Sequence, residues 1–177
     1  TEGRLRLCFR REELPERLET QAGSISLDAA RLGSLRARLR DVAGVAGFDE
    51  HRTEDLVHAV GEAAMNAVVH AGGGEARIYH DGGRTIQVWL EDHGTGISEE
   101  RLHLATLERG FTTAGTWGHG FWMMLKLADR VWLHTGQDGT TVVLEQDRDR
   151  PAPHWFDSTG SLNGQSLQAG QFDRTEW

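Results

Sequence analysis

The sequence predicts an α+β fold, a two-layer α/β sandwich in which helices cover one face of a mixed, mainly antiparallel sheet. Two observations support this prediction. Two pairs of segments with alternating apolar residues each flank a short turn, which is typical of β-hairpins. Three segments with helical apolar spacing lie before and between these hairpins. Helices that are segregated from hairpins along the chain favour a sheet with helices on one face.

The N-terminal part of the chain is predicted to form two strands and one helix. Residues 4–9 alternate between polar and apolar side chains, and residues 23–27 predict a second short strand. Between Ala29 and Ala46 apolar residues recur at helical spacing, and Gly44 and Gly47 then interrupt the pattern. The apolar positions of this helix are Leu32, Leu35, Leu39 and Val42.

A second, longer helix is predicted to follow Thr53 and to end at about Ala71. Thr53 is a suitable N-cap, and the two carboxylates that come directly after it suit the positive end of the helix dipole. Three consecutive glycines at 72–74 then end the helix.

Two hairpins are predicted on either side of a glycine-rich region. In the first, residues 75–80 and 85–91 flank a turn, and in the second, residues 130–135 and 140–145 do so. One face of the strand at 85–91 carries Ile86, Val88 and Leu90, and the other carries Gln87, Trp89 and Glu91.

The stretch between the hairpins, from Asp92 to Gly120, is rich in glycine and threonine. It contains one short helical piece, for which Ser98 is the predicted N-cap. A further helix is predicted over residues 121–128, directly before the second hairpin. The expected order is therefore strand, strand, helix, helix, hairpin, loop, helix, hairpin.

The domain organisation follows from where the periodic pattern begins and ends. Residues 1–21 form a lead-in that contains the first strand, and residues 22–146 form one domain. Residues 147–177 are polar and lack periodicity, so they are predicted to be a flexible tail or linker. The chain begins with Thr1 rather than Met, which suggests a piece of a longer protein.

The composition argues against several classes of partner. The formal net charge of −8 and the lack of a basic stretch disfavour nucleic acid and anionic membrane surfaces. No apolar run approaches the roughly 20 residues that a membrane helix requires. The single cysteine, Cys8, excludes a disulfide within one chain and indicates a reducing compartment, so we expect a cytoplasmic protein with a buried structural thiol.

The first candidate motif lies in the second helix. Glu62, Asn66 and His70 follow an i, i+4, i+8 spacing, so their side chains project from one stripe, with small alanines around them. A carboxylate can accept a proton, and an amide oxygen can bind Mg²⁺. His70 is interpreted as structural support for the end of the helix, with a phosphate-side donor as the alternative. Taken alone, the motif also fits a polar stripe that faces solvent.

Two glycine-containing motifs follow. Asp92 stands at the end of a predicted strand, where it could accept a hydrogen bond from an exocyclic amine, and Gly94 and Gly96 allow a ligand to lie close. Gly118 and Gly120 precede a helix whose N-terminal N–H groups could bind phosphate. An ordinary turn and a plain hinge, respectively, are the alternatives for the two motifs when each is taken alone.

Together, the three motifs resemble the N, G1 and G2 boxes of the GHKL ATPase superfamily (Bergerat fold), whose members include sensor histidine kinases and anti-sigma-factor serine kinases. The resemblance covers residues 22–146. The segments 110–114 and 139–142 look most like the anti-sigma-factor serine kinase branch. The sequence shows no phosphoacceptor-helix signature, because His51 lacks the apolar and proline context of a histidine-kinase dimerisation helix.

The resemblance implies a role for each motif residue. Glu62 would be the general base for a partner's hydroxyl, and Asn66 would bind a Mg²⁺ ion that bridges the phosphates of ATP. Asp92 would hold adenine, with Gly94 and Gly96 letting the ring sit close. Residues 97–119 would form an ATP lid. The remaining nucleotide contacts would come from the lid, the residue after it and the last hairpin: Thr112, Thr113, Gly118, His119, Gly120 and Thr141.

The sequence departs from the pattern of a kinase at one point. Charge stabilisation provides most of the catalysis in phosphoryl transfer, yet residues 110–120 contain no Lys or Arg. Arg109 and Lys126 are the nearest cations in the sequence. Trp122, which follows the last glycine motif, either packs in the core or narrows the site.

The resemblance predicts an ATP- and Mg²⁺-dependent serine/threonine kinase of the anti-sigma-factor type. Its partners would be an antagonist protein (an anti-anti-sigma factor with a STAS-like fold) and a sigma factor, and a homodimer would be common for such a domain. The alternative is a non-catalytic, nucleotide-dependent binding module within a larger signalling protein. An ATPase in which Glu62 activates water ranks last, because the chain is too short for the additional domains of those branches.

Overall fold

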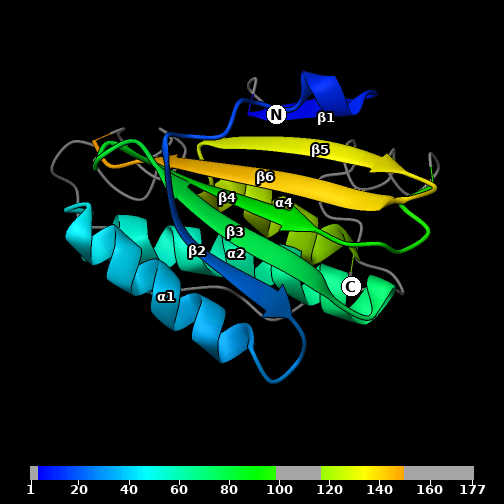
Figure 1. Ribbon diagram of the computed structural model, residues 1–177, viewed down its shortest axis with the longest axis horizontal. Coiled ribbons are helices and arrows are strands. Elements are labelled where there is room, and N and C mark those ends of the chain that lie inside the picture. The colour runs from blue at the N-terminus through cyan, green and yellow to red at the C-terminus, as the bar shows by residue number, and fades with distance from the viewer. Residues whose placement is uncertain (1–3, 99–116, 150–177) are drawn as a thin grey trace, which may run out of the picture.

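The computed structural model describes residues 4–98 and 117–149, which form a layer of helices packed on one sheet (Figure 1). The order of elements follows the predicted succession of strands, helices and hairpins. In chain order they are β1 (Leu5–Cys8), η1 (Arg11–Glu13), β2 (Thr20–Leu27), α1 (Leu32–Val45), α2 (Glu50–Ala71), β3 (Gly74–His80), β4 (Thr85–Glu91), α4 (Trp117–Leu127), β5 (Arg130–Gly136) and β6 (Gly139–Asp147).

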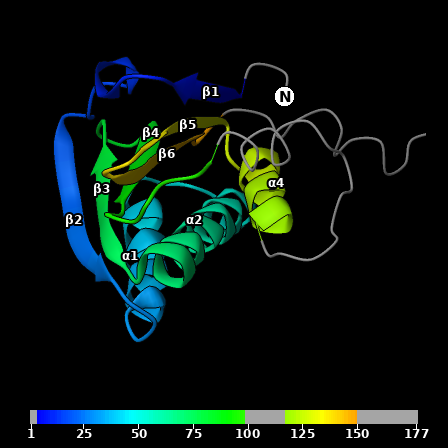
Figure 2. The same cartoon turned by 90° about the vertical axis from the view of Figure 1, so that its right-hand side faces the viewer.

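The six strands form one sheet in the order β1-β5-β6-β4-β3-β2. Neighbouring strands are antiparallel except β1 and β5, which are parallel. The helices α1, α2 and α4 lie on the same side of this sheet (Figure 2). The predicted two-layer α+β fold with a mixed, mainly antiparallel sheet is therefore confirmed. Among the helices of the described residues, none combines the length and apolar character needed to cross a bilayer.

The main core fills the space between the helices and the sheet. All four apolar positions that predicted the first helix are buried, because they form one stripe of α1 that faces α2 and the sheet. Leu56 of α2, Ile78 of β3 and Leu144 of β6 are fully buried in the same cluster. This packing fixes α2 along the sheet, and α2 carries the first candidate motif.

The opposite face of the sheet is covered by the segment that crosses from β1 to β2. Leu14 and Leu18 of this segment pack in a second apolar cluster with Tyr79 and Trp89. The guanidinium carbon of Arg17 lies 4.8 Å from the centre of the Trp89 ring, which is a cation–π distance. The predicted lead-in therefore serves as a cover for the outer face of the sheet.

Cys8 lies at the end of β1 and is buried in this second cluster. Burial in apolar surroundings raises the pKa of its thiol, because the thiolate would lose solvation there. The prediction of a buried thiol is confirmed.

The second helix begins earlier than the sequence predicted. Asp49, not Thr53, is the N-cap: its backbone is extended, and its carboxylate accepts a hydrogen bond from the Arg52 N–H at 2.7 Å. Thr53 lies inside α2, where its hydroxyl donates to the carbonyl oxygen of Asp49 at 2.8 Å. The predicted end is confirmed, because Gly72 adopts the left-handed conformation (φ 75°) that commonly ends a helix.

Other boundaries differ by a few residues. β2 begins at Thr20 rather than residue 23, and α4 begins at Trp117 rather than Phe121. The last strand continues to Asp147, one residue past the predicted domain boundary. The short helix predicted after Ser98 and most of the predicted tail at 147–177 lie outside the described residues.

Replacing Asp49 by alanine is expected to lower the free energy of unfolding by about 1 kcal/mol, because the Arg52 N–H loses its acceptor at the start of α2. Asp49→Asn keeps a side-chain oxygen in the same place and should lose much less. Urea unfolding followed by circular dichroism measures both variants. Equal losses for the two would contradict the capping role.

Candidate functional site

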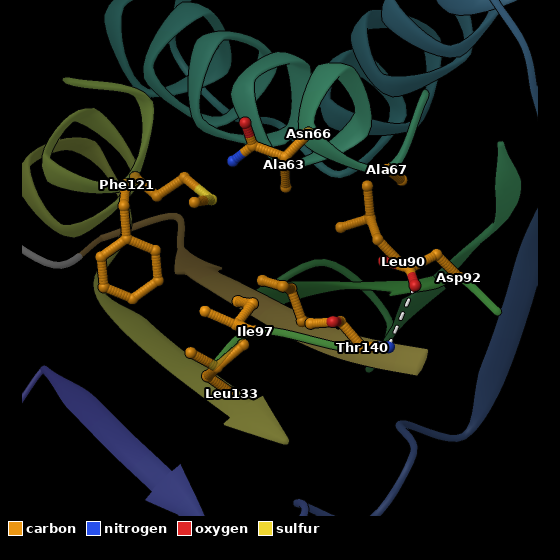
Figure 3. Close-up of a pocket in the computed structure, with 11 residues that line it drawn as sticks. Ala63, Asn66, Ala67, Leu90, Asp92, Ile97, Phe121, Leu133 and Thr140 are labelled. Carbon is orange, nitrogen blue, oxygen red and sulfur yellow. Dashed lines mark hydrogen bonds between the residues drawn. The ribbon is translucent and has the colours of Figure 1, made fainter. Parts of the chain in front are cut away.

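The site begins on α2, whose spacing aligns the predicted motif residues along one side of the helix. Glu62 and Asn66 are half-buried, whereas His70 is exposed in the last turn. The small residues Ala63 and Ala67, on the buried side of the helix, form one wall of a pocket together with Asn66. Figure 3 shows these side chains projecting from α2 toward the sheet and α4.

The pocket lies between α2, α4 and the sheet and is partly open to solvent. Its polar side chains are those of Asn66, Asp92 and Thr140. An apolar slot with a few placed polar groups is the usual form of a small-molecule site. The apolar lining consists of Ala63, Ala67, Leu90, Ile97, Phe121, Met124, Leu133 and Val142.

Asp92 follows the last residue of β4 and is held in a fixed orientation. Its Oδ1 accepts hydrogen bonds from the backbone N–H of Gly94 at 2.9 Å and from that of Thr140 at 3.1 Å, the second of which is drawn in Figure 3. Its own N–H donates to the carbonyl oxygen of Thr140 at 2.9 Å. Because Oδ1 is already used, Oδ2 is the oxygen that can accept from a ligand.

Gly94 and Gly96 are both required by close packing of the loop after β4. A Cβ at Gly94 would lie 2.8 Å from the Cβ of Ala71, at the end of α2. Gly96 has a φ of +72°, and a Cβ there would overlap the carbonyl oxygen of Gly136. The two glycines therefore let the loop lie directly against α2 on one side and the β5–β6 turn on the other.

The last hairpin contributes Thr140 to the pocket and does not bring Thr141 into it. Successive residues of a strand point to opposite faces, so Thr140 and Val142 line the pocket while Thr141 faces the other side of the sheet. Thr141 is nevertheless only 3% exposed, because the outer face is covered as well. Thr140 was not among the residues predicted for the site, because both threonines of this strand are buried and the sequence pattern does not distinguish their faces.

The third motif lies within the first turn of α4 rather than in a loop before it. Gly118, His119 and Gly120 all have helical backbone conformation. A methyl group at Gly120 would lie 2.6 Å from Oε2 of Glu62 and 3.8 Å from Nδ2 of Asn66. The first and third motifs are therefore adjacent in space, while Thr112 and Thr113 lie outside the described residues.

Trp122 neither packs in the core nor lines the pocket. Its side chain is 42% exposed on α4, and the Lys126 ammonium lies 4.6 Å from the centre of its ring. The expectation that Trp122 packs in the core was therefore wrong. Within the described residues, the pocket lining contains no Lys or Arg. This agrees with the absence of Lys and Arg from residues 110–120 of the sequence.

Residues 25–145 match the model of the histidine kinase-like ATPase domain. The chain belongs to this family. The match confirms the resemblance to GHKL ATPases that the three motifs indicated, and it makes this chain a kinase-like ATP-binding domain. The segment that covers the outer face of the sheet lies before the matched residues.

Two solved structures resemble this ATPase domain. The crystal structure of the RsbU and RsbW domains of Rv1364c from Mycobacterium tuberculosis aligns at 25% identity with a TM-score of 0.52, covering 73% of this chain and 33% of that one. The present chain thus spans about a third of that protein's length. The histidine kinase domain of the Erythrobacter litoralis EL346 blue-light activated histidine kinase aligns at 18% identity with a TM-score of 0.44, covering 67% and 60%. No curated protein sequence matches the chain significantly.

Proposed function

We propose that this domain binds Mg-ATP and transfers the γ-phosphate to a serine or threonine hydroxyl of a partner protein, as an anti-sigma-factor-type kinase. The observation that carries the proposal is that Gly120 lies directly against Glu62 and Asn66. A Cβ built on Gly120 would be 2.6 Å from Oε2 of Glu62 and 3.8 Å from Nδ2 of Asn66. A proton acceptor, a polar amide and the N-terminal turn of α4 therefore meet beside the pocket, where phosphate groups would be favoured.

In this proposal, the adenine end of the nucleotide would lie in the inner part of the pocket. A purine ring needs apolar walls, which Ala67, Leu90 and Val142 supply. The exocyclic amine of adenine needs an acceptor, which Asp92 Oδ2 can supply because Oδ1 is bonded to backbone N–H groups. In this proposal, Thr140 takes the supporting role that the sequence resemblance gave to Thr141.

The phosphates of the nucleotide would share a magnesium ion for which the protein supplies few ligands. Mg²⁺ usually keeps several waters and takes one or two protein oxygens besides the phosphates. Asn66 offers such an oxygen, and the described residues contain no cluster of three or more acidic, His or Cys ligands that would indicate a different kind of metal site. When bound, the ion would neutralise phosphate charge; the chain's own part is to hold Asn66 beside Gly120.

Glu62 is the proposed general base. The hydroxyl oxygen of the partner attacks the γ-phosphorus, the bond from that phosphorus to the β–γ bridging oxygen breaks, and ADP leaves. The hydroxyl proton passes to the Glu62 carboxylate. Glu62 is half-buried, so part of its side chain remains exposed to solvent.

The partner class rests on the resemblance to the anti-sigma-factor branch and on the solved structure described as containing RsbU and RsbW domains. We propose an antagonist protein with a STAS-like fold as the phosphate acceptor and a sigma factor as a second binding partner. A cytoplasmic location and a homodimer belong to the same proposal. Buried Cys8 fits a reducing compartment.

One observation favours the alternative, a nucleotide-dependent binding module without catalysis. The described pocket lining has no cation that could stabilise charge on the transferred phosphoryl group. Such a domain would bind Mg-ATP and a signalling partner but transfer nothing.

An assay with γ-labelled ATP, Mg²⁺ and a panel of STAS-domain antagonists distinguishes the two functions. Labelled phosphoserine or phosphothreonine on an antagonist supports the kinase. Saturable binding of ATP with no transfer to any member of the panel supports the binding module. If ATP does not bind at millimolar concentration, both proposals fail.

Replacing Gly120 by alanine is expected to slow phosphoryl transfer by roughly 10- to 100-fold, because the added methyl group displaces the Glu62 carboxylate, and small misplacements of reacting groups cost that much. The fold should survive, because the group that must move is the end of a flexible side chain. Gly44→Ala is the matched control, since a Cβ there meets nothing within 4 Å. Transfer rates and thermal unfolding of both variants test this, and unchanged transfer in Gly120→Ala would contradict it.

A further inference from the structure

Thr135 does not line the pocket, but its side chain is hydrogen-bonded to two residues that do. Oγ1 of Thr135, near the end of β5, accepts a hydrogen bond from the backbone N–H of Ile97 at 2.8 Å. The same oxygen lies 3.1 Å from Oγ1 of Thr140. Ile97 and Thr140 both line the pocket, as Figure 3 shows, whereas Thr135 does not. We propose that Thr135 is a positioning residue for the nucleotide, an inference that rests on the proposed ATP site.

The loop from Asp92 to Ile97 needs such an anchor because it contains no helix or strand. Its first residue is fixed to β6 by the bond from the Asp92 N–H to the Thr140 carbonyl oxygen, at 2.9 Å. Its last residue is fixed to β5 through Thr135. An irregular segment depends on such side-chain acceptors to satisfy its backbone N–H groups. Thr135 therefore determines where Ile97 stands as a wall of the pocket.

The arrangement of protons gives Thr135 a second effect. The Thr135 oxygen accepts from the Ile97 N–H and also shares a hydrogen bond with the Thr140 hydroxyl, in which either oxygen can be the donor. When Thr135 donates, the Thr140 hydroxyl proton can point into the pocket. In that arrangement the site presents a donor at Thr140 and an acceptor at Asp92, which suits a purine that offers a ring nitrogen and an exocyclic amine.

The loop from Asp92 to Ile97 packs directly against the β5–β6 turn. A Cβ at Gly96 would lie 3.0 Å from Oγ1 of Thr135 and would overlap the Gly136 carbonyl oxygen. Loss of the Thr135 hydroxyl would leave the Ile97 N–H without this acceptor, and this end of the loop would no longer be held against β5. Loss of that bond should weaken nucleotide binding without disrupting the sheet.

The test compares Mg-ATP affinity in Thr135→Val, Thr135→Ser and Thr141→Val, measured by titration calorimetry. Thr141 is the matched control, because it is a buried threonine of the adjacent strand that faces away from the pocket. We expect about tenfold weaker binding in Thr135→Val, since one hydrogen bond and its orienting effect are lost. Thr135→Ser and Thr141→Val should remain within about twofold of wild type.

Hydrogen exchange separates positioning from a general loss of stability. The Ile97 amide should exchange faster in Thr135→Val, while amides of β5 and β6 keep their protection. If Thr135→Val does not fold, Thr135→Ala removes the same hydroxyl with less steric demand. Wild-type affinity in a folded Thr135→Val or Thr135→Ala variant would overturn the inference. Absence of ATP binding in the wild-type domain would instead overturn the proposed function.

Discussion

Replacing Glu62 by glutamine is expected to slow phosphoryl transfer to the partner by roughly 10²- to 10⁴-fold, the range of general-base contributions. The amide has the same size as the carboxylate and can occupy the space beside Gly120, but it cannot take up the hydroxyl proton. ATP affinity should stay within about twofold of wild type, because Asp92 and Thr140 line the pocket and Glu62 does not. The loss should therefore appear in kcat and not in nucleotide binding.

The matched control for this prediction is Glu54→Gln. Glu54 lies on the same helix, two turns earlier, and forms an exposed ion pair with Arg40 at 2.6 Å. Exposed pairs contribute little to stability, so this variant should transfer phosphate at the wild-type rate. Single-turnover transfer from γ-labelled ATP measures both variants. A Glu62→Gln variant that transfers as fast as Glu54→Gln would remove Glu62 from the mechanism and leave only positioning by the site.

The position of Glu62 and Asn66 was predictable from the sequence because local rules decide it. Residues four apart share one side of a helix, and the left-handed glycine at 72 ended α2 where expected. The start of α2 was not predictable in the same way. Asp49 and Thr53 are both good N-caps, and Asp49 is the N-cap in the structure, so that Arg52 lies within α2.

Arg52 also shows why long-range partners escaped the sequence analysis. Its guanidinium forms a buried ion pair with Asp129, which is 77 residues away in the chain. The same guanidinium donates to the backbone carbonyl oxygen of Asp147 through Nε at 3.1 Å. No periodic pattern links these three residues, and their proximity follows only from the packing of α2 against the end of β6 and the residues after α4.

The choice between Thr140 and Thr141 depended on sheet register, which the hairpin pattern left open. In the sheet, Thr141 pairs with Glu91 and Val142 with Leu90. Glu91 belongs to the outer face, which is covered by the segment between β1 and β2, so both faces of β4 and β6 are buried. With apolar and polar residues buried on both faces, hydrophobicity alone could not tell which threonine faced the helices.

Replacing Asp92 by asparagine is expected to weaken Mg-ATP binding by at least roughly 100-fold, because a site built to pair with a polar group rejects a mismatched one by large factors. The local structure should persist, since the asparagine oxygen can still accept from the N–H groups of Gly94 and Thr140. The substitution replaces Oδ2, the proposed acceptor for adenine, with an NH₂ group. Two donors, this NH₂ group and the exocyclic amine of adenine, would then face each other.

The control for this variant is Asp81→Asn. Asp81 makes the same kind of backbone contacts in the β3–β4 turn, accepting from the N–H groups of Arg84 at 3.0 Å and Thr85 at 2.8 Å, but it does not line the pocket. Its ATP affinity should equal that of wild type, which would show that loss of a capping carboxylate is harmless in itself.

The reversed hydrogen bond in Asp92→Asn also predicts a change in base preference, because inosine triphosphate carries an oxygen acceptor where ATP carries the amine. Calorimetric titrations should therefore show that Asp92→Asn binds inosine triphosphate more tightly than ATP, and a variant that still prefers ATP would mean that Asp92 does not contact the base.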